Sequence, residues 1–371
     1  MKPNIFISFT LLLLSCNEAK EINSSNVFDL DMNSSKEISF DEWVIDVECF
    51  QLNGSGTNIY WGIIEYNSFF YLVFENERCV SVYKKTGEHV RTIKNIRQGN
   101  ASMPNDIFIN EKENQLCVLE SFGQISIYNL DGDFIEQKTL PFKAAKVTQA
   151  GQDHYLFFDA GFEKTTSFFL RISNENDFST KSEFVPKYNT YNLMPIFTFT
   201  DNNEEIFIRL LKNDTIYVCD KTSLKITPRW HLNFSGDFLT HRDEPEGGFS
   251  DKMYAEILKE NKKYTDIRGF HCINNFVFMR LLGRDYSFRA IDISNNYTYR
   301  FNTLIDNIKI PPQGSAKDGF LVVMTSQEFI SHYSNPDNST KYESIKDMLN
   351  QINKNNNGLI VIKIKLREDL P

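Results

Sequence analysis

The densest group of polar side chains in this 371-residue sequence lies where His241, Arg242, Asp243 and Glu244 follow one another. Further carboxylates come shortly after them. Carboxylate oxygens are the ligands that hard cations prefer, and charged side chains also hydrogen-bond sugar hydroxyls. The group therefore indicates a ligand-binding site for a cation or a sugar. A solvated acidic loop has the same composition, so both interpretations stay open.

The sequence motifs of common catalytic centres are absent. There is no H-E-x-x-H zinc pair, G-x-S-x-G elbow, P-loop or G-x-G-x-x-G fingerprint. The six histidines are dispersed along the chain. No residue is therefore predicted to be catalytic, and no cofactor is predicted.

The composition restricts the partners and the redox chemistry. The formal net charge is −9, and no lysine- and arginine-rich cluster is present, which excludes nucleic acid as a partner. The five cysteines after Cys16 are scattered without a C-x-x-C pair, so they predict neither a zinc site nor a redox motif. Cys79, Cys117 and Cys219 lie in strand-like segments, where we expect small buried side chains.

The N-terminus carries a targeting signal. A lysine precedes an apolar segment, residues 5–14, that is too short to span a bilayer and fits a secretory signal. The segment ends in Leu13-Leu14-Ser15-Cys16, which resembles a bacterial lipobox. The resemblance implies a signal peptide over residues 1–15, lipidation of Cys16 and, because Asn17 follows, an outer-membrane lipoprotein on the periplasmic or cell-surface face. The alternative is an ordinary cleaved signal. Residues 16–36 are polar and predict a flexible tether.

A repeat identifies the fold. SVYKKTGEHV (81–90) and SIYNLDGDFI (126–135) match at an interval of 45 residues (126 − 81 = 45). Each copy is an antiparallel meander with a glycine in its turn, Gly87 and Gly132, where a positive φ is needed. In a third copy Asn176 stands at the glycine position, and asparagine tolerates the same conformation. Strands repeating every 40 to 50 residues are typical of propeller blades.

Six such units account for residues 37–371, so we predict an all-β, six-bladed β-propeller of four-stranded antiparallel blades. The early segment 37–52 has no blade of its own. A ring must be closed to avoid open sheet edges. We therefore expect this segment to complete the blade made by the C-terminal strands.

Two insertions interrupt the repeat, at residues 231–264 and 325–357. Both predict helices, the first after Ser250 and the second from the spacing of Ile345, Met348, Leu349 and Ile352. Long insertions of a propeller project from one rim and often build its binding face.

A propeller also has an axial channel lined by its innermost strands. Polar residues near predicted strand starts are candidates to meet there, and oxygen ligands from several blades suit Ca²⁺. In six-bladed lactonases and sugar dehydrogenases such residues hold Ca²⁺ or act as bases. Two arginines in apolar strands, Arg209 and Arg280, either pair with buried carboxylates or face an edge. The channel candidates are Glu65, Asn105, Asp106, Asp153, His154, Glu204 and His271.

Over residues 37–367 the sequence resembles the six-bladed β-propeller lipoproteins of Bacteroidetes, a family whose function is largely uncharacterised. The resemblance rests on Asn213–Tyr217 (NDTIY), on Leu359–Lys365 (LIVIKIK), and on the lipobox joined to the N-terminal strand segment. One departure is the loop 97–104, which holds a single glycine where such proteins often have several. The resemblance implies a lipid-anchored binding or scaffold module for a glycan, a peptide or a partner protein. The alternative is a lactonase- or hydrolase-type enzyme that uses a divalent cation in the channel.

Overall fold

The structure is a computed structural model. It describes residues 27–53, 60–74, 77–94, 96–97, 100–101, 103–120, 123–159, 168–186, 198–243, 256–257, 260, 263–283, 287–352 and 358–368.

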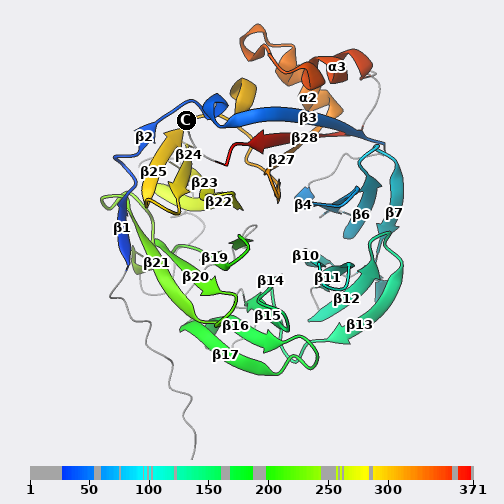
Figure 1. The fold of residues 1–371 in the computed structure, drawn as a ribbon, viewed down its shortest axis with the longest axis vertical. Coiled ribbons are helices and arrows are strands. Elements are labelled where there is room, and N and C mark those ends of the chain that lie inside the picture. The colour runs from blue at the N-terminus through cyan, green and yellow to red at the C-terminus, as the bar shows by residue number, and fades with distance from the viewer. Residues whose placement is uncertain are drawn as a thin grey trace, which may run out of the picture.

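The described residues form six blade sheets, each built on an antiparallel four-stranded meander and arranged around a ring, which confirms the predicted propeller (Figure 1). Blade 1 holds β4 (Tyr60–Tyr66), β5 (Phe69–Phe74), β6 (Cys79–Lys84) and β7 (His89–Ile93). Blade 2 holds β10 (Pro104–Asn110), β11 (Gln115–Glu120), β12 (Gln124–Asn129) and β13 (Phe134–Thr139). Blade 3 holds β14 (Lys146–Gln149), β15 (His154–Phe158), β16 (Phe168–Asn174) and β17 (Thr180–Pro186). A small hairpin, β8 (Ile96–Arg97) and β9 (Asn100–Ala101), lies between blades 1 and 2.

Blades 4 and 5 have five strands, one more than predicted. Blade 4 holds β18 (Phe199–Asp201), β19 (Glu205–Arg209), β20 (Thr215–Asp220), β21 (Ile226–Asn233) and, outermost, β1 (Phe28–Asp31). Blade 5 holds β22 (Tyr264–Ile273), β23 (Phe276–Gly283), β24 (Phe288–Asp292), β25 (Tyr297–Phe301) and, outermost, β2 (Lys36–Glu37). Blade 6 holds β26 (Gly314–Ala316), β27 (Gly319–Thr325), β28 (Leu359–Leu366) and β3 (Val44–Leu52).

The N-terminal segment closes the ring as predicted. β3 is the outer strand of blade 6 and pairs antiparallel with β28, from Leu52 opposite Leu359 to Val44 opposite Leu366. The prediction of a flexible tether up to residue 36 was wrong for its last part. β1 pairs in parallel with β21, and β2 pairs in parallel with β25. Leu30 and Met32 are buried there, so burial of apolar side chains holds this segment against blade 4.

The tight turns explain why the first two copies of the repeat look alike. Gly87 and Gly132 have φ of 88° and 86°, and in each turn the glycine N–H donates to the carbonyl three residues earlier. The third copy differs from the prediction, because Phe178 (φ 53°), not Asn176, adopts the left-handed conformation. Its turn is one residue longer and is held by the Asn174 side chain, which accepts the N–H of Asn176 at 2.8 Å.

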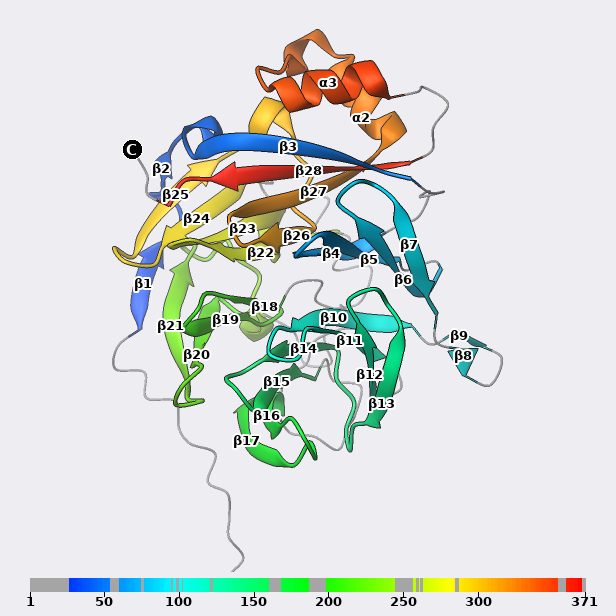
Figure 2. The ribbon, with the colours of Figure 1, turned by 45° about the vertical axis from the view of Figure 1, so that its right-hand side comes forward.

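The two faces of the ring differ. Each blade repeats the same antiparallel order, so connections between its first and second strands and between its third and fourth strands lie on one face. These are short turns. The connections of the opposite face include the long ones, residues 234–263 and 326–358. The longer one contains α2 (Ser326–Tyr333), η4 (Pro336–Asn338) and α3 (Glu343–Gln351), and α3 packs against β3 (Figure 2).

The helix predicted near Ile345 and Met348 is thus confirmed as α3, with both side chains buried. Most of the helix predicted after Ser250 lies outside the described residues. The described residues also contain the short 3₁₀ segments η1 (Phe40–Glu42), η2 (His241–Asp243) and η3 (Ile305–Asn307).

Aromatic side chains fill the spaces between blades. Trp43 is fully buried between blades 5 and 6, with edge contacts to Phe276, Phe278 and Phe301 at centroid distances of 5.8, 5.5 and 5.4 Å. Edge-to-face pairs stabilise beyond their buried area. The high aromatic content therefore serves the core. Cys79, Cys117 and Cys219 are buried, as predicted.

Candidate functional site

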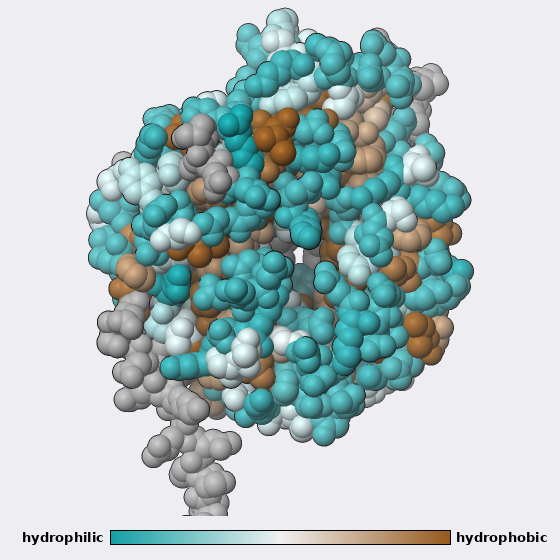
Figure 3. Space-filling view, viewed as in Figure 1, coloured by the Kyte–Doolittle hydropathy of each residue, from teal (hydrophilic) through white to brown (hydrophobic). Residues whose placement is uncertain are grey.

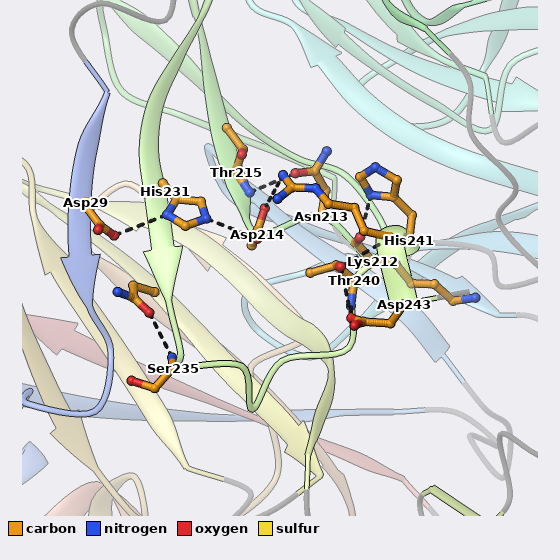
Figure 4. Close-up of polar contacts among 12 residues, drawn as sticks. Asp29, Lys212, Asn213, Asp214, Thr215, His231, Ser235, Thr240, His241 and Asp243 are labelled. Carbon is orange, nitrogen blue, oxygen red and sulfur yellow. Dashed lines mark hydrogen bonds and ion pairs between the residues drawn. The ribbon is translucent and has the colours of Figure 1, made fainter. Parts of the chain in front are cut away.

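The predicted polar group at residues 241–244 is engaged in local contacts (Figure 4). His241, Arg242 and Asp243 form η2, at the start of the long connection after β21. The Asp243 carboxylate accepts hydrogen bonds from the backbone N–H of Thr240 at 2.7 Å and from its hydroxyl at 3.0 Å. The backbone N–H of His241 donates to the Lys212 carbonyl at 2.8 Å. Glu244 lies outside the described residues.

Arg242 leads to a network that sequence reasoning missed. Its guanidinium lies 3.5 Å from the carboxylate of Asp214, which is 8% exposed. The imidazole of His231 contacts Asp214 at 3.1 Å through Nε2 and Asp29 of β1 at 3.2 Å through Nδ1 (Figure 4). His231 on β21 thus links β1, the outermost strand of blade 4, to Asp214, which lies just before β20. The sequence motif Asn213-Asp214-Thr215 was the available signal for this network. In the structure the Asn213 side chain accepts the N–H of Thr215 at 2.8 Å.

The axial channel opens at the centre of the ring (Figure 3). Three of its seven predicted polar residues are not on the innermost strands. Asp153 precedes and His154 begins β15, the second strand of blade 3, and Glu204 lies in the turn between β18 and β19. The prediction was therefore wrong for these three residues. Polar turn residues precede the second strand of a blade as well as the first, so the sequence could not tell the two apart.

The other channel candidates have partners of their own. Asp106 accepts from Lys146 at 3.1 Å and from the N–H of Val147 at 3.0 Å, while burial raises the pKa of its carboxyl. Asn105 donates to the carbonyl of Ala144 at 3.2 Å. These contacts join blades 2 and 3.

Glu65 and His271 lie towards the ends of their strands, not the starts. Burial lowers the pKa of His271 to about 4, so the ring is neutral at physiological pH, and its Nε2 lies 3.3 Å from the carbonyl of Pro312. The candidates on the innermost strands therefore lie at opposite ends of those strands and do not come together. Within the part of the chain that the structure describes, no group of three or more His, Cys, Asp or Glu could hold a metal ion.

The sequence left open whether Arg209 and Arg280 pair with carboxylates or face a sheet edge. Arg209 pairs with a carboxylate. It is 2% exposed and lies 2.7 Å from Asp266 of the next blade. Arg280 lies over the ring of Phe288 at 5.5 Å.

An ion-pair network joins the last blade to the first. Lys363 of β28 contacts Glu65 of β4 at 3.0 Å and Asp318 at 2.9 Å, and Lys85 also contacts Glu65. The side chains of Lys363 and Glu65 are 10% and 7% exposed. Burial alone would lower the pKa of Lys363, but the carboxylates of Asp318 and Glu65 raise it overall. The ion pairs therefore stabilise the contact between blade 6 and blade 1, where the ring closes.

A cavity of 390 Å³ lies where the N-terminal segment meets blades 5 and 6. Three parts of the chain line it: residues 37–41, residues 301–307 and the two residues Asp337 and Ser339. Four acidic residues, Glu37, Asp41, Asp306 and Asp337, are among the lining residues. No sequence motif marked this cavity, because its walls are separated by up to about three hundred residues along the chain.

The fold and these contacts define a six-bladed β-propeller whose polar residues mostly join its blades. Residues 17–267 match a family described as 6-bladed beta-propeller, and the chain belongs to that family. This match confirms the resemblance seen in the sequence.

Many solved structures have a similar fold, and two crystal structures are representative. One is a Bacteroides fragilis protein described as exported, at 15% identity and a TM-score of 0.64, covering 91% of this chain and 99% of that one. The other is a DUF4221 family member from Bacteroides vulgatus, at 12% identity and a TM-score of 0.50, covering 88% and 98%. No curated protein matches the sequence. Across the described ranges, no helix has the length and apolar character to cross a membrane.

Proposed function

We propose that the protein is a lipid-anchored binding module of the bacterial cell envelope, tethered to the outer membrane through Cys16. It holds a glycan, a peptide or a partner protein on the ring face that carries the long connections. Cys16 lies outside the described residues, so the anchor rests on the lipobox resemblance.

The observation that carries the binding function is the difference between the two faces. One face has only short turns where the structure describes it, while the other carries the connections of residues 234–263 and 326–358. Insertions collect where a rigid scaffold presents a recognition surface, because they change the surface without disturbing the core. The cavity lined by residues 301–307 belongs to a connection of this same face.

The alternative of a channel enzyme has no comparable support. Asp106 and Glu65 are each paired with a lysine, and His271 is buried and neutral. A general base or a calcium ligand must instead be reachable by substrate or cation.

Two measurements test the proposal. Cells grown with an alkyne fatty acid should label the wild-type protein but not Cys16→Ser, and only the wild type should fractionate with the outer membrane. Thermal unfolding of the purified protein with a panel of envelope oligosaccharides and peptides tests the binding function, since a ligand at 100 times its Kd stabilises by about 2.7 kcal/mol. Equal labelling of the wild type and Cys16→Ser would refute the lipid anchor. A wild-type protein that no oligosaccharide or peptide stabilises, and that captures no partner protein from the envelope, would refute the binding function.

A further inference from the structure

The outer edges of the six blades are covered unequally. Blades 4 and 5 each carry a fifth strand, β1 and β2, and α3 packs against β3 of blade 6. In the described part of the chain, β7, β13 and β17 end the sheets of blades 1, 2 and 3 with no further strand outside them (Figure 1). We propose that β13 pairs edge to edge with β13 of a second copy of this chain, so that the protein is a two-fold dimer joined at blade 2. The dimer goes beyond the proposed binding function and does not depend on it.

β13 is the most exposed of the three open edge strands. Five of its six residues are exposed and the sixth is half-buried. Phe134 and Ile135, which follow one another, are 59% and 48% exposed. Among the described residues, the other two open edge strands carry no exposed large apolar side chain. Apolar side chains on an unpaired edge favour pairing with another chain.

The free backbone groups of β13 have a defined position. The N–H of Leu140 donates to the carbonyl of Gly123, on the side of β12, at 2.8 Å. Because the backbone groups of a strand alternate between its two sides, those of Gln137 and Thr139 point away from β12. The strand is regular from Glu136 to Thr139, since its register shift lies before Glu136. This stretch can therefore exchange hydrogen bonds with another strand.

Charge selects one register for an antiparallel two-fold pair. If the two-fold axis passes through Glu136 or through Lys138, that residue faces its own copy, and like charges directly opposite one another destabilise a sheet. If the axis passes through Gln137, Glu136 of each chain lies opposite Lys138 of the other, and two favourable pairs form. Glu136 and Lys138 lie 3.4 Å apart within one chain, on the same side of β13, as this pairing requires.

The other two open edges are less suited to pair with themselves. β17 has the same spacing of opposite charges in Lys181 and Glu183, but Glu183 is held by Arg171 of β16 at 2.8 Å. Its last residue, Pro186, has no N–H to donate. β7 has Arg91 at its centre, where it would face Arg91 of the second copy. These differences favour β13.

The dimer leaves the binding face of the ring available. β13 lies on the outer rim (Figure 1), so pairing through it does not use the face that carries the long connections. Phe134 and Ile135 lie just beyond the paired stretch, where the second copy covers them.

The first test is sedimentation of the purified full chain in detergent, which gives the Kd of the dimer. Glu136→Lys and Lys138→Glu each place like charges opposite one another, so each should raise the Kd at least about fivefold. The double variant Glu136→Lys/Lys138→Glu restores both pairs of opposite charge and should return the Kd to within about twofold of the wild type. Lys181→Glu on β17 is the matched control and should leave the Kd unchanged.

The second test is disulfide cross-linking in intact cells, which reports the register and the occupant of the edge. In Gln137→Cys the two thiols lie at the two-fold axis, where the Cα atoms of a hydrogen-bonded pair are about 5.5 Å apart, within reach of a disulfide. We expect a cross-linked dimer from Gln137→Cys after oxidation and none from Thr92→Cys, an exposed position of β7.

Several results would overturn the proposal. They are a monomeric wild type, single reversals that leave the Kd unchanged, a double variant that binds no more tightly than the single ones, and equal cross-linking from Gln137→Cys and Thr92→Cys. An adduct of Gln137→Cys with a different protein, and no dimer, would also overturn it, because another chain then occupies the edge. Neither test measures ligand binding or lipidation, so their failure is separate from a failure of the proposed function.

Discussion

Replacing Lys363 by methionine should destabilise the ring far more than replacing Lys365 on the same strand. Lys363 is buried and paired with the buried Glu65, whereas Lys365 lies at 22% exposure and pairs with Glu48 at 2.6 Å near solvent. Breaking a buried pair from one side costs about 3–5 kcal/mol, because the remaining charge is left without compensation. Lys85 still contacts Glu65, so we expect a value of about 3 kcal/mol, near the low end of that range.

An exposed pair contributes at most about 1 kcal/mol, which sets the expectation for Lys365→Met. For a domain of this size each kcal/mol lowers the Tm by about 1–2 °C, so Lys363→Met should lower it by roughly 3–6 °C. The assay is thermal unfolding followed by circular dichroism.

A double-mutant cycle with Glu65→Leu isolates the pair. Once Glu65 is absent, Lys363→Met should cost clearly less than it does alone, with a coupling of at least about 1 kcal/mol. The reasoning is refuted if Lys363→Met and Lys365→Met shift the Tm equally, or if the two changes at Glu65 and Lys363 are additive.

Three further changes test other parts of the structure. Gly87→Ala should be much more damaging than Gly132→Ala in urea unfolding. Both glycines have positive φ, which costs about 1 kcal/mol, but an alanine Cβ at 87 would lie 2.0 Å from the carbonyl of Gln51, whereas at 132 it meets only flexible side chains; equal losses would argue against the tight contact with blade 6. Asp306→Asn should raise the Tm at pH 7. The pKa of Asp306 is raised on folding, so its ionised form costs stability above that pKa, and the gain should disappear below about pH 4, where both states hold the proton; a gain that persists in acid would contradict this. Met32→Ala removes a fully buried side chain from the segment on blade 4 and should cost about 2–4 kcal/mol or release the segment, seen as faster proteolysis before residue 36; unchanged proteolysis and stability would show that this packing is unimportant.

The ring could be predicted from the sequence because its signals are local. Each turn glycine and each apolar run is recognised from a few neighbouring residues. The same pattern then recurs after 45 residues (126 − 81 = 45). Ring closure by β3 followed from a physical requirement, since an open blade would leave a sheet edge unpaired. The turn at Asn174 was misjudged because an extra residue moves the left-handed position without changing the composition.

The remaining features depend on partners far away in the chain. β1 and β2 have four and two residues, too few to show a period. β1 pairs in parallel with a strand 202 positions later (230 − 28 = 202), and β2 with one 263 positions later (299 − 36 = 263). The Lys363–Glu65 pair spans 298 positions. The innermost strands β18 and β26 have three residues each, so their starts could not be distinguished from turns before second strands.

The ligand site at residues 241–244 stays a prediction from composition, because charged residues cluster there. In the structure Asp243 caps its own turn, and Arg242 reaches Asp214. The acidic cavity, by contrast, has no local density of charge in the sequence, since its four carboxylates come from three separate segments.

The most direct test of the account is photo-crosslinking in intact envelopes from one position on each face of the ring. Asn302 lies on the face of the long connections and lines the cavity, and Glu113 lies in a short turn of the opposite face; both are exposed. With a photoreactive residue at each position in turn, we predict a specific adduct from position 302 and none from position 113. Adducts from position 113 alone, or the same adducts from both, would contradict the claim that this face is the binding face.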